Sequence, residues 1–180
     1  MIRVQEAEFD IGAELAGFAQ GDRSVGGIAC FVGQVREMAA GEPVAAMTLE
    51  HYPGMTEKML SEVEAEARAR WPLADCLVIH RYGRLEPGER IVLVATASTH
   101  RQAALEACQF LIDWLKTKAP LWKMEEGPGG RAHWVEARES DDRAAGRWNK
   151  DSDYGCLINP LRASRHASIL LSHPCSPGGR

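Results

Sequence analysis

The sequence predicts an α+β domain, and three observations support this fold class. Segments with strand-like composition and segments with helical periodicity follow one another without the strict alternation of a doubly wound parallel sheet. Apolar residues recur at helical spacing over residues 55–71 and 100–116. Short β-rich runs between glycine- and proline-containing turns account for most of the remainder. We therefore expect one α+β domain over residues 1–150, with an antiparallel sheet and packed helices, followed by a disordered tail at 151–180.

Composition limits the function classes. With 180 residues, 45% hydrophobic and 26% charged, the chain has the size and balance of one globular domain. A net charge of −4 argues against a general nucleic-acid binder, although it leaves room for a local basic pocket that binds a small anion. The N-terminus does not resemble a signal peptide, and no stretch approaches the roughly 20 apolar residues of a membrane span. We expect a cytoplasmic protein that contacts neither membrane nor nucleic acid.

The cysteines and histidines show no metal-site or disulfide pattern. The five cysteines are odd in number and contain no Cys-x-x-Cys pair, and Cys30, Cys76 and Cys108 fall inside apolar segments. Small buried thiols fit this pattern better than a disulfide framework or a zinc site. The histidines are scattered without ligand-like pairing, so no metal site is expected.

The first third of the chain predicts strands around one short helix. Ile2–Val4 is expected to be an edge strand, and Asp10 the N-cap of a helix that runs to about Gln20. Its apolar face is formed by Ile11, Leu15 and Phe18. Val25–Val35 is β-rich, and its glycines indicate a bulge or the close approach of another backbone. After a turn-rich loop, Val44–His51 resumes as a strand, and these two strands are predicted to form an antiparallel pair.

The middle third predicts a helix followed by a hairpin. Apolar periodicity runs from Met55 to Trp71, and Pro72 ends the helix. Leu77–Tyr82 and Ile91–Ser98 are predicted strands, joined by turn signals at residues 83–89.

The longest predicted helix follows this hairpin. Thr99 and Gln102 form a capping-box pattern at its start, and Pro120 stops it. The remaining expected elements are a short re-entry after Pro120, a loop at 127–130, a strand at 133–137 and a short helix within 139–150.

Three lysines, Lys116, Lys118 and Lys123, surround the end of this helix and are interleaved with leucines and tryptophans. They can be surface charges that extend over buried aromatic side chains and complement the helix dipole. Alternatively, an amine held against apolar surface releases its proton more readily and can act as base or nucleophile. Spacing leaves both interpretations open. The neighbouring Glu125-Glu126 pair is expected to be solvated.

Cationic groups also mark two other places. His100 and Arg101 stand at a predicted helix N-terminus, where free N–H groups and the dipole favour a phosphate; a merely exposed helix start is the alternative. Arg36 follows a β-run at the start of a loop, where functional side chains often lie. If residues 100–116 form one helix, a rise of about 1.5 Å per residue puts His100 and Lys116 roughly 24 Å apart. A shared site then requires a two-fold dimer, with His100 and Arg101 reaching into the partner's pocket.

Six segments, in chain order, carry a family resemblance. They are Phe31-Val-Gly-Gln-Val-Arg36, Leu49-Glu-His-Tyr-Pro-Gly-Met55, Ile79-His-Arg-Tyr-Gly83, Ser98-Thr-His-Arg101, Leu115-Lys-Thr-Lys-Ala-Pro-Leu-Trp-Lys123 and Trp134-Val-Glu-Ala-Arg138. Together they cover about Val25–Trp148 and resemble the large, catalytic subunit of molybdopterin synthase. The tail at 151–180 lies outside the resemblance.

The resemblance implies an α/β hammerhead-type fold and a homodimer of large subunits, each binding one small subunit to give a heterotetramer. The small partner is ubiquitin-like, and its C-terminal Gly-Gly thiocarboxylate enters the large subunit's pocket. The family converts cyclic pyranopterin monophosphate (precursor Z) into molybdopterin by two sulfur transfers, a step of molybdenum cofactor biosynthesis. The metal enters later, so the resemblance implies neither cofactor nor metal here.

The same resemblance assigns site residues. Lys116 and Lys123 match the family's essential lysines. The matching substrate-binding positions are Arg36, His100 and Arg101, and both lysines also count among the substrate-binding residues. Gln34 and Val35 beside Arg36, and Met124 and Glu125 beside Lys123, fall in the same binding segments. Arg138 matches an arginine near the pocket. Lys118 stands where relatives carry arginine, so only its charge is expected to matter.

Two other function classes are kept beside the enzyme. The chain could be a non-catalytic docking partner of a ubiquitin-like sulfur carrier, or a general binding domain for phosphate ligands. The presence of Lys116, Lys123 and Arg36 together with His100 and Arg101 favours the enzyme, because docking alone does not require these residues.

Overall fold

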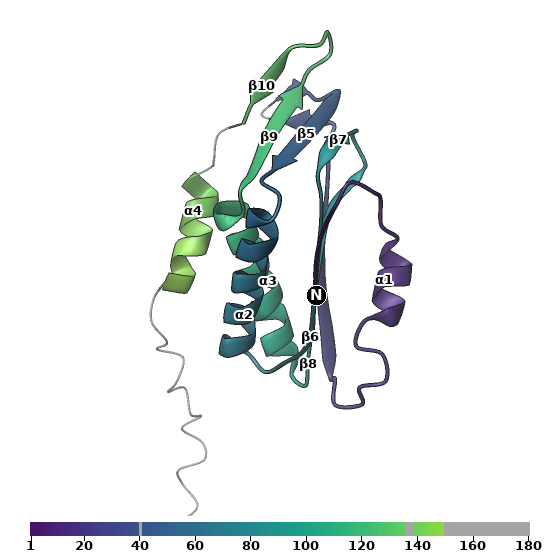
Figure 1. Cartoon of the computed structure of the whole chain (residues 1–180), viewed down its shortest axis with the longest axis vertical. Helices are drawn as coiled ribbons and strands as arrows, with labels where there is room; N and C mark the ends of the chain where they lie inside the picture. Colours follow the sequence, from purple (N-terminus) through teal and green to yellow (C-terminus); the bar gives the residue numbers. More distant parts are fainter. Residues whose placement is uncertain (40, 136–138, 150–180) are drawn as a thin grey trace, which may run out of the picture. The chain divides into compact units, whose positions relative to one another are not determined.

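The computed structural model describes residues 1–39, 41–135 and 139–149 (Figure 1). Its elements, in chain order, are β1 (Ile2–Gln5), α1 (Ile11–Gly17), β2 (Gly27–Gln34), β3 (Met38–Ala39), β4 (Glu42–Pro43), β5 (Ala46–His51), α2 (Met55–Arg70), β6 (Leu73–Arg81), β7 (Gly83–Leu85), β8 (Arg90–Ser98), α3 (Arg101–Lys118), β9 (Leu121–Glu126), β10 (Ala132–Trp134), α4 (Glu139–Gly146) and a 3-10 turn (Arg147–Asn149). The α+β class is confirmed. The predicted tail at 151–180 lies outside the described residues, and the domain boundary at residue 150 stays a prediction.

The first sheet has the strand order β1-β6-β8-β2, and its central strands β6 and β8 are buried on both faces. Only the β1–β6 pairing is parallel; the others are antiparallel. Successive side chains of a strand point to opposite faces. Accordingly Val78 and Val94 belong to one core cluster, while Ile79 and Leu93 belong to another. The predicted hairpin is confirmed, since β6 and β8 pair with Val78 opposite Val94.

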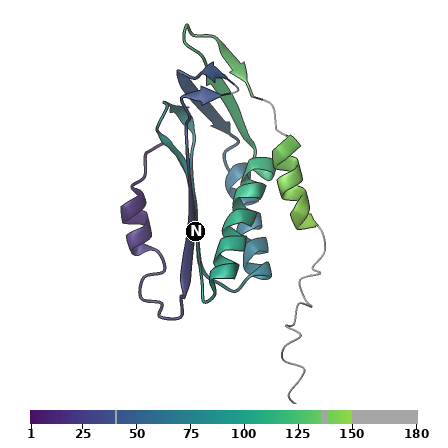
Figure 2. The same cartoon turned by 180° about the vertical axis from the view of Figure 1, so that it is seen from behind.

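Helices cover the two faces of this sheet (Figures 1 and 2). α2 and α3 pack on the face that carries Val78, and α1 lies on the other side. The Asp10 carboxylate accepts the Ala13 N–H at 2.7 Å, which confirms it as the N-cap of α1. The apolar face of α1 packs as predicted, although the helix ends at Gly17 rather than near Gln20.

The second sheet has the order β10-β9-β5-β7 and is antiparallel throughout. A single residue, Tyr82, separates β6 from β7, so the chain passes directly from the first sheet to the second there. The predicted turn at 83–89 therefore contains a strand. Gly83 has a φ of 86°, a left-handed conformation that favours glycine at this crossing.

The predicted pairing of 25–35 with 44–51 is wrong. β2 pairs with β8 of the first sheet, and β5 pairs with β7 and β9 of the second. The loop between them closes on itself as the small β3–β4 hairpin, which lets the chain change sheets. Neighbouring strands in sequence usually pair, and that default fails where a chain passes between two sheets.

The glycines of the β2 region behave as predicted. A Cβ on Gly26 would lie 2.2 Å from the Thr99 carbonyl oxygen, so only glycine permits this backbone approach. The register of β2 against β8 shifts between Gly33 and Gln34, which is a β-bulge. Bulges redirect the side chains that follow them, and the residues that follow this one are Val35 and Arg36.

Two local predictions are wrong, namely the N-cap of the longest helix and the burial of Cys30. The N-cap of α3 is His100 rather than Thr99 and makes no side-chain cap; the Gln102 amide instead donates to Glu106 at 2.8 Å. Cys76 and Cys108 are buried, and burial raises the pKa of these thiols to about 12 and about 11. Cys30 is exposed, because β2 is an edge strand.

No helix among the described residues is long and apolar enough to cross a membrane.

Candidate functional site

One face of the second sheet carries charged groups among apolar side chains. Directly paired residues of antiparallel strands point to the same face, and Lys123 pairs with Leu49 while Glu125 pairs with Met47. We call this surface the site face. Its members from β5 and β9 are Met47, Leu49, His51, Leu121, Lys123 and Glu125.

Lys123 and Glu125 form an ion pair on the site face. The Lys123 ammonium lies 2.7 Å from a Glu125 carboxylate oxygen. The Glu125 side chain is 9% exposed and that of Lys123 27%. The expectation of a solvated Glu125 is therefore wrong, since it lies against Met47 in the sheet. The two-residue spacing of Lys123 and Glu125 on a strand was the signal available in the sequence.

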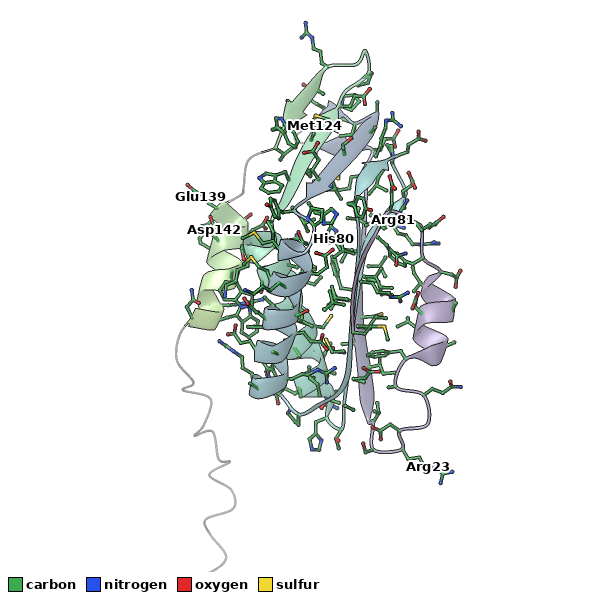
Figure 3. All side chains as sticks on the ribbon, viewed as in Figure 1. Arg23, His80, Arg81, Met124, Glu139 and Asp142 are labelled. Atoms are coloured by element: carbon green, nitrogen blue, oxygen red, sulfur yellow. The ribbon has the colours of Figure 1, made fainter. Side chains whose placement is uncertain are left out.

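A partly buried lysine paired with a buried carboxylate has a fixed position. Removing either charge would leave the other one uncompensated, which is costly away from water. The exposed His133 imidazole also faces this carboxylate, with Nε2 at 3.9 Å. Met124 points to the opposite face and pairs with Thr48; Figure 3 labels it on β9.

The segment Gln34–Arg36 is held next to the site face through Val35. Val35 is buried in the core cluster that contains Met47, Leu49 and Leu85. Its neighbours Gln34 and Arg36 are both exposed. Through Val35, the Arg36 segment thus packs against Met47 and Leu49, the two residues that pair with Glu125 and Lys123.

A buried arginine fixes the backbone beside Arg36. The Arg81 guanidinium donates to the Glu89 carboxylate at 3.1 Å, to the Arg90 carbonyl at 3.1 Å and to the Glu6 carbonyl at 3.0 Å. The Glu89 carbonyl in turn accepts the Val35 N–H at 2.9 Å, and the Val35 carbonyl accepts the Gly88 N–H at 2.9 Å. Sequence reasoning missed Arg81 and Glu89, because only the fold shows what an interior arginine contacts.

The Glu89 carboxylate is fixed from both sides. It accepts the Glu86 N–H at 2.6 Å and the Arg81 guanidinium, and these contacts, the first above all, lower the pKa of the carboxyl. The 86–89 turn that supports Val35 therefore depends on an ionised carboxylate.

Lys116 and Lys118 lie in the last turn of α3, and both are exposed. Ala119 and Pro120 then connect the helix to β9, and the buried Thr56 hydroxyl donates to the Pro120 carbonyl at 3.4 Å. The Lys118 ammonium stands 3.5 Å from the centre of the Trp114 ring, which is a cation–π contact. Lys118 therefore fits the interpretation as a surface charge over an aromatic side chain.

His100 and Arg101 lie at the other end of α3, and both are exposed. The Arg101 backbone is next to Gly27, at the start of β2, whereas Gln34–Arg36 stands at the end of that strand. One chain therefore does not bring His100 and Arg101 to the site face. Arg138 lies outside the described residues.

The fold and the site define an α+β protein whose two clusters of cationic side chains, at opposite ends of one helix, suit anionic ligands. The family model described as "MoaE protein" matches residues 4–118, and the chain belongs to this family. A molybdopterin synthase catalytic subunit from Ralstonia nicotianae is 52% identical over 163 residues, covering 91% of this chain and 92% of that protein.

Solved structures agree. The molybdopterin biosynthesis MoaE protein of Burkholderia ambifaria matches with a TM-score of 0.70 and 50% identity, covering 82% of this chain and 97% of that chain. A protein-protein complex of subunits 1 and 2 of molybdopterin-converting factor from Helicobacter pylori contains a chain of the same fold, with a TM-score of 0.64 and 18% identity over 76% of this chain and 91% of that one.

Proposed function

We propose that this chain is the sulfur-transferring, catalytic subunit of a molybdopterin synthase. The observation that carries the proposal is the Lys123–Glu125 pair on the site face, next to the Arg36 segment, in a chain of the MoaE family. Neither a docking module nor a general phosphate binder requires a lysine fixed by a buried carboxylate.

The proposed substrate, a cyclic pyranopterin monophosphate, needs a cationic seat for its phosphate. Arg36 supplies one guanidinium beside the site face, and His100 and Arg101 add an imidazole and a second guanidinium from the partner chain. The sulfur donor, a C-terminal thiocarboxylate, is also an anion. Lys116 and Lys123 attract it and stabilise the oxyanion that forms as sulfur leaves the acyl carbon.

The ion pair with Glu125 gives the Lys123 ammonium a fixed direction before the substrate arrives. Fixed donors stabilise developing charge without reorganisation during the reaction, which is the main source of such catalysis. A lysine can also exchange protons with the pterin ring as it opens. Gln34, Val35 and Met124 belong to the two binding segments, and we also assign Arg138 to the pocket.

The length of α3 supports a homodimer. Its 18 residues separate Arg101 from Lys116 by more than a small substrate spans, so a complete site uses both chains. Each large subunit then binds one ubiquitin-like small subunit, giving a heterotetramer in the cytoplasm. The named complex of two subunits from Helicobacter pylori supports such a partner for this fold.

One assay tests the proposal. Purified chain is mixed with thiocarboxylated small subunit and pterin precursor, and dithiolene product is measured. We expect product with the thiocarboxylate and none with the same small subunit ending in a plain carboxylate. A complex that forms without product would instead establish the docking partner. Binding of the pterin phosphate with no dependence on the small subunit would establish a general phosphate-binding domain.

A further inference from the structure

His51 lies on the site face, one step along the strands from Lys123. His51 pairs with Leu121, and Leu49 pairs with Lys123, so His51 and Lys123 are diagonal neighbours on one face. Diagonal neighbours of an antiparallel pair are roughly 7–8 Å apart at the backbone, within reach of long side chains. The lysine of the site face therefore has an imidazole as its neighbour on one side and the Glu125 carboxylate on the other.

The His51 imidazole is largely enclosed, and its Nδ1 atom is buried without a hydrogen bond among the described residues. Its side chain is 10% exposed, and Nδ1 has no hydrogen-bond partner among the described residues. A buried polar atom left without a partner is costly, and such atoms in native proteins call for an explanation. A nitrogen that takes up a proton during the reaction would account for it.

A carboxylate stands ready for the charge of a protonated His51. Glu57 Oε1 lies 4.0 Å from His51 Nδ1, while Oε2 accepts the Gly54 N–H at 2.6 Å at the start of α2. Because the second contact holds the carboxylate in place, the first oxygen stays directed at the imidazole. The Tyr82 ring covers His51, with ring centres 4.4 Å apart.

The other histidine of this region cannot play the same part. His80, labelled in Figure 3 next to Arg81, is fully buried, and burial lowers the pKa of its imidazole to about 4. Its Nδ1 lies 2.8 Å from the Arg81 carbonyl, which can only accept, so Nδ1 carries the proton of a neutral ring. His80 therefore stays neutral near pH 7 and leaves proton uptake to His51.

We propose that His51 is a positioning residue that acts through Lys123: once the Lys123 ammonium has given its proton to the substrate, the His51 imidazolium, whose charge Glu57 balances, returns a proton to the amine. The proton balance is simple, since the amine becomes an ammonium again and the imidazolium becomes a neutral imidazole. The imidazole then takes up a proton from solvent, which restores the starting state. This inference rests on the proposed function.

The first test is the pH dependence of product formation by His51→Gln, which keeps a polar side chain but cannot take up the proton. We expect the rate of the unaltered protein to fall at high pH, because a neutral imidazole has no proton to return to the amine. His51→Gln should lose this alkaline limb and run at least about tenfold slower at neutral pH. An unchanged rate and profile, or an equal loss at every pH, would overturn the proposal.

Glu57→Gln tests the source of the counter-charge. Without the carboxylate, the protonated imidazole is less stable, so the alkaline limb moves to lower pH. The matched control is Glu62→Gln on the same helix, whose side chain is 63% exposed and pairs only with Lys58 among the described residues. A limb that stays in place in Glu57→Gln, or moves equally in both variants, contradicts the assigned role of Glu57.

Lys123→Arg separates this inference from the proposed function. Arginine keeps the charge but does not release a proton, so we expect a slow enzyme without the alkaline limb. Adding His51→Gln to it then has no further effect, because the two residues act in one step. Full activity of Lys123→Arg would refute the role of Lys123 itself, whereas additive losses would refute only the coupling to His51.

A direct titration covers the case in which His51→Gln fails to fold. The His51 ring signals are followed by NMR against pH in the full chain and in Lys123→Met. Removing the neighbouring positive charge should move the His51 titration to higher pH. Identical titrations in the two proteins would show that the imidazole does not sense Lys123, and the inference would fall.

Discussion

The two ends of α3 differ in how completely the chain prepares them for a ligand. At the C-terminal end, the helix leads into β9, where Lys123 is paired with the buried Glu125. The N-terminal end presents His100 and Arg101, which are exposed, and its N-cap makes no side-chain hydrogen bond.

This difference indicates a division of labour. Groups that must be in place before the reaction are fixed by the sheet and by a buried carboxylate, while the exposed pair can adjust to a ligand. The difference fits the proposed roles, in which the C-terminal end carries the chemical step and the N-terminal end binds phosphate across the proposed dimer.

The largest expected effect is that of Lys116→Ala on sulfur transfer. We expect a loss of at least about a hundredfold in product formation, because the oxyanion loses a cationic donor. Dimer formation and small-subunit binding should persist, since Lys116 is exposed. The control is Lys58→Ala on α2, whose side chain is 76% exposed. Near-normal product from Lys116→Ala would remove the C-terminal end of α3 from the chemistry.

A mixed dimer tests whether the two ends belong to one site across two chains. Chains carrying Lys116→Ala and chains carrying Arg101→Ala are given different affinity tags, and the mixed dimer is purified. If sites are shared, one site carries both substitutions and the other is intact, so about half of the normal activity returns. If each site lies within one chain, every site carries one lesion and no activity returns.

A third prediction concerns the stability of the β6 end, next to His51. The unfolded chain binds a proton at His80 below a pKa of about 6.5, whereas the folded chain does so only below about 4. Folding stability therefore falls as the pH is lowered through this window, by about 2 kcal/mol from pH 6.5 to pH 5. Urea unfolding of the unaltered chain and of His80→Gln measures it, and His80→Gln should lack this component. Parallel pH dependences would show that His80 is not desolvated as described.

The smallest expected effect is that of Lys118→Met. It removes a cation–π contact with Trp114 that contributes about 0.5–1 kcal/mol at an exposed position. Thermal unfolding should show a correspondingly small loss, and product formation should change by less than about threefold. A loss as large as that of Lys116→Ala would mean that the C-terminal end uses all three lysines.

Local patterns predicted the elements well and their pairing poorly. The helices at 55–71 and 100–116 follow from apolar periodicity, and α2 and α3 confirm them within a few residues. The hairpin of β6 and β8 follows from its turn signals. The two pairing partners of β5 could not be predicted, because they are distant in sequence. α2 and β6 lie between β5 and β7, and α3 lies in addition between β5 and β9.

The functional site also has a part that the sequence predicted and a part that it did not. The family motifs indicate Arg36, His100, Arg101, Lys116 and Lys123, and the length of α3 already separates two of them from the others. Burial is a property of the packed sheet, so the sequence could not reveal that Glu125 is enclosed or that the Arg81 guanidinium supports the Val35 backbone.

The sequence by itself determined the α+β class, the family and the cationic residues, because these depend on local periodicity and on residue identity. Tertiary structure alone decided which of those residues share a face. The alternation of side chains across paired strands placed Lys123 between Glu125 and His51, and that register is set by contacts between distant parts of the chain. It is this neighbourhood, with one buried carboxylate and one largely enclosed imidazole, that distinguishes Lys123 from the exposed lysines at the end of α3.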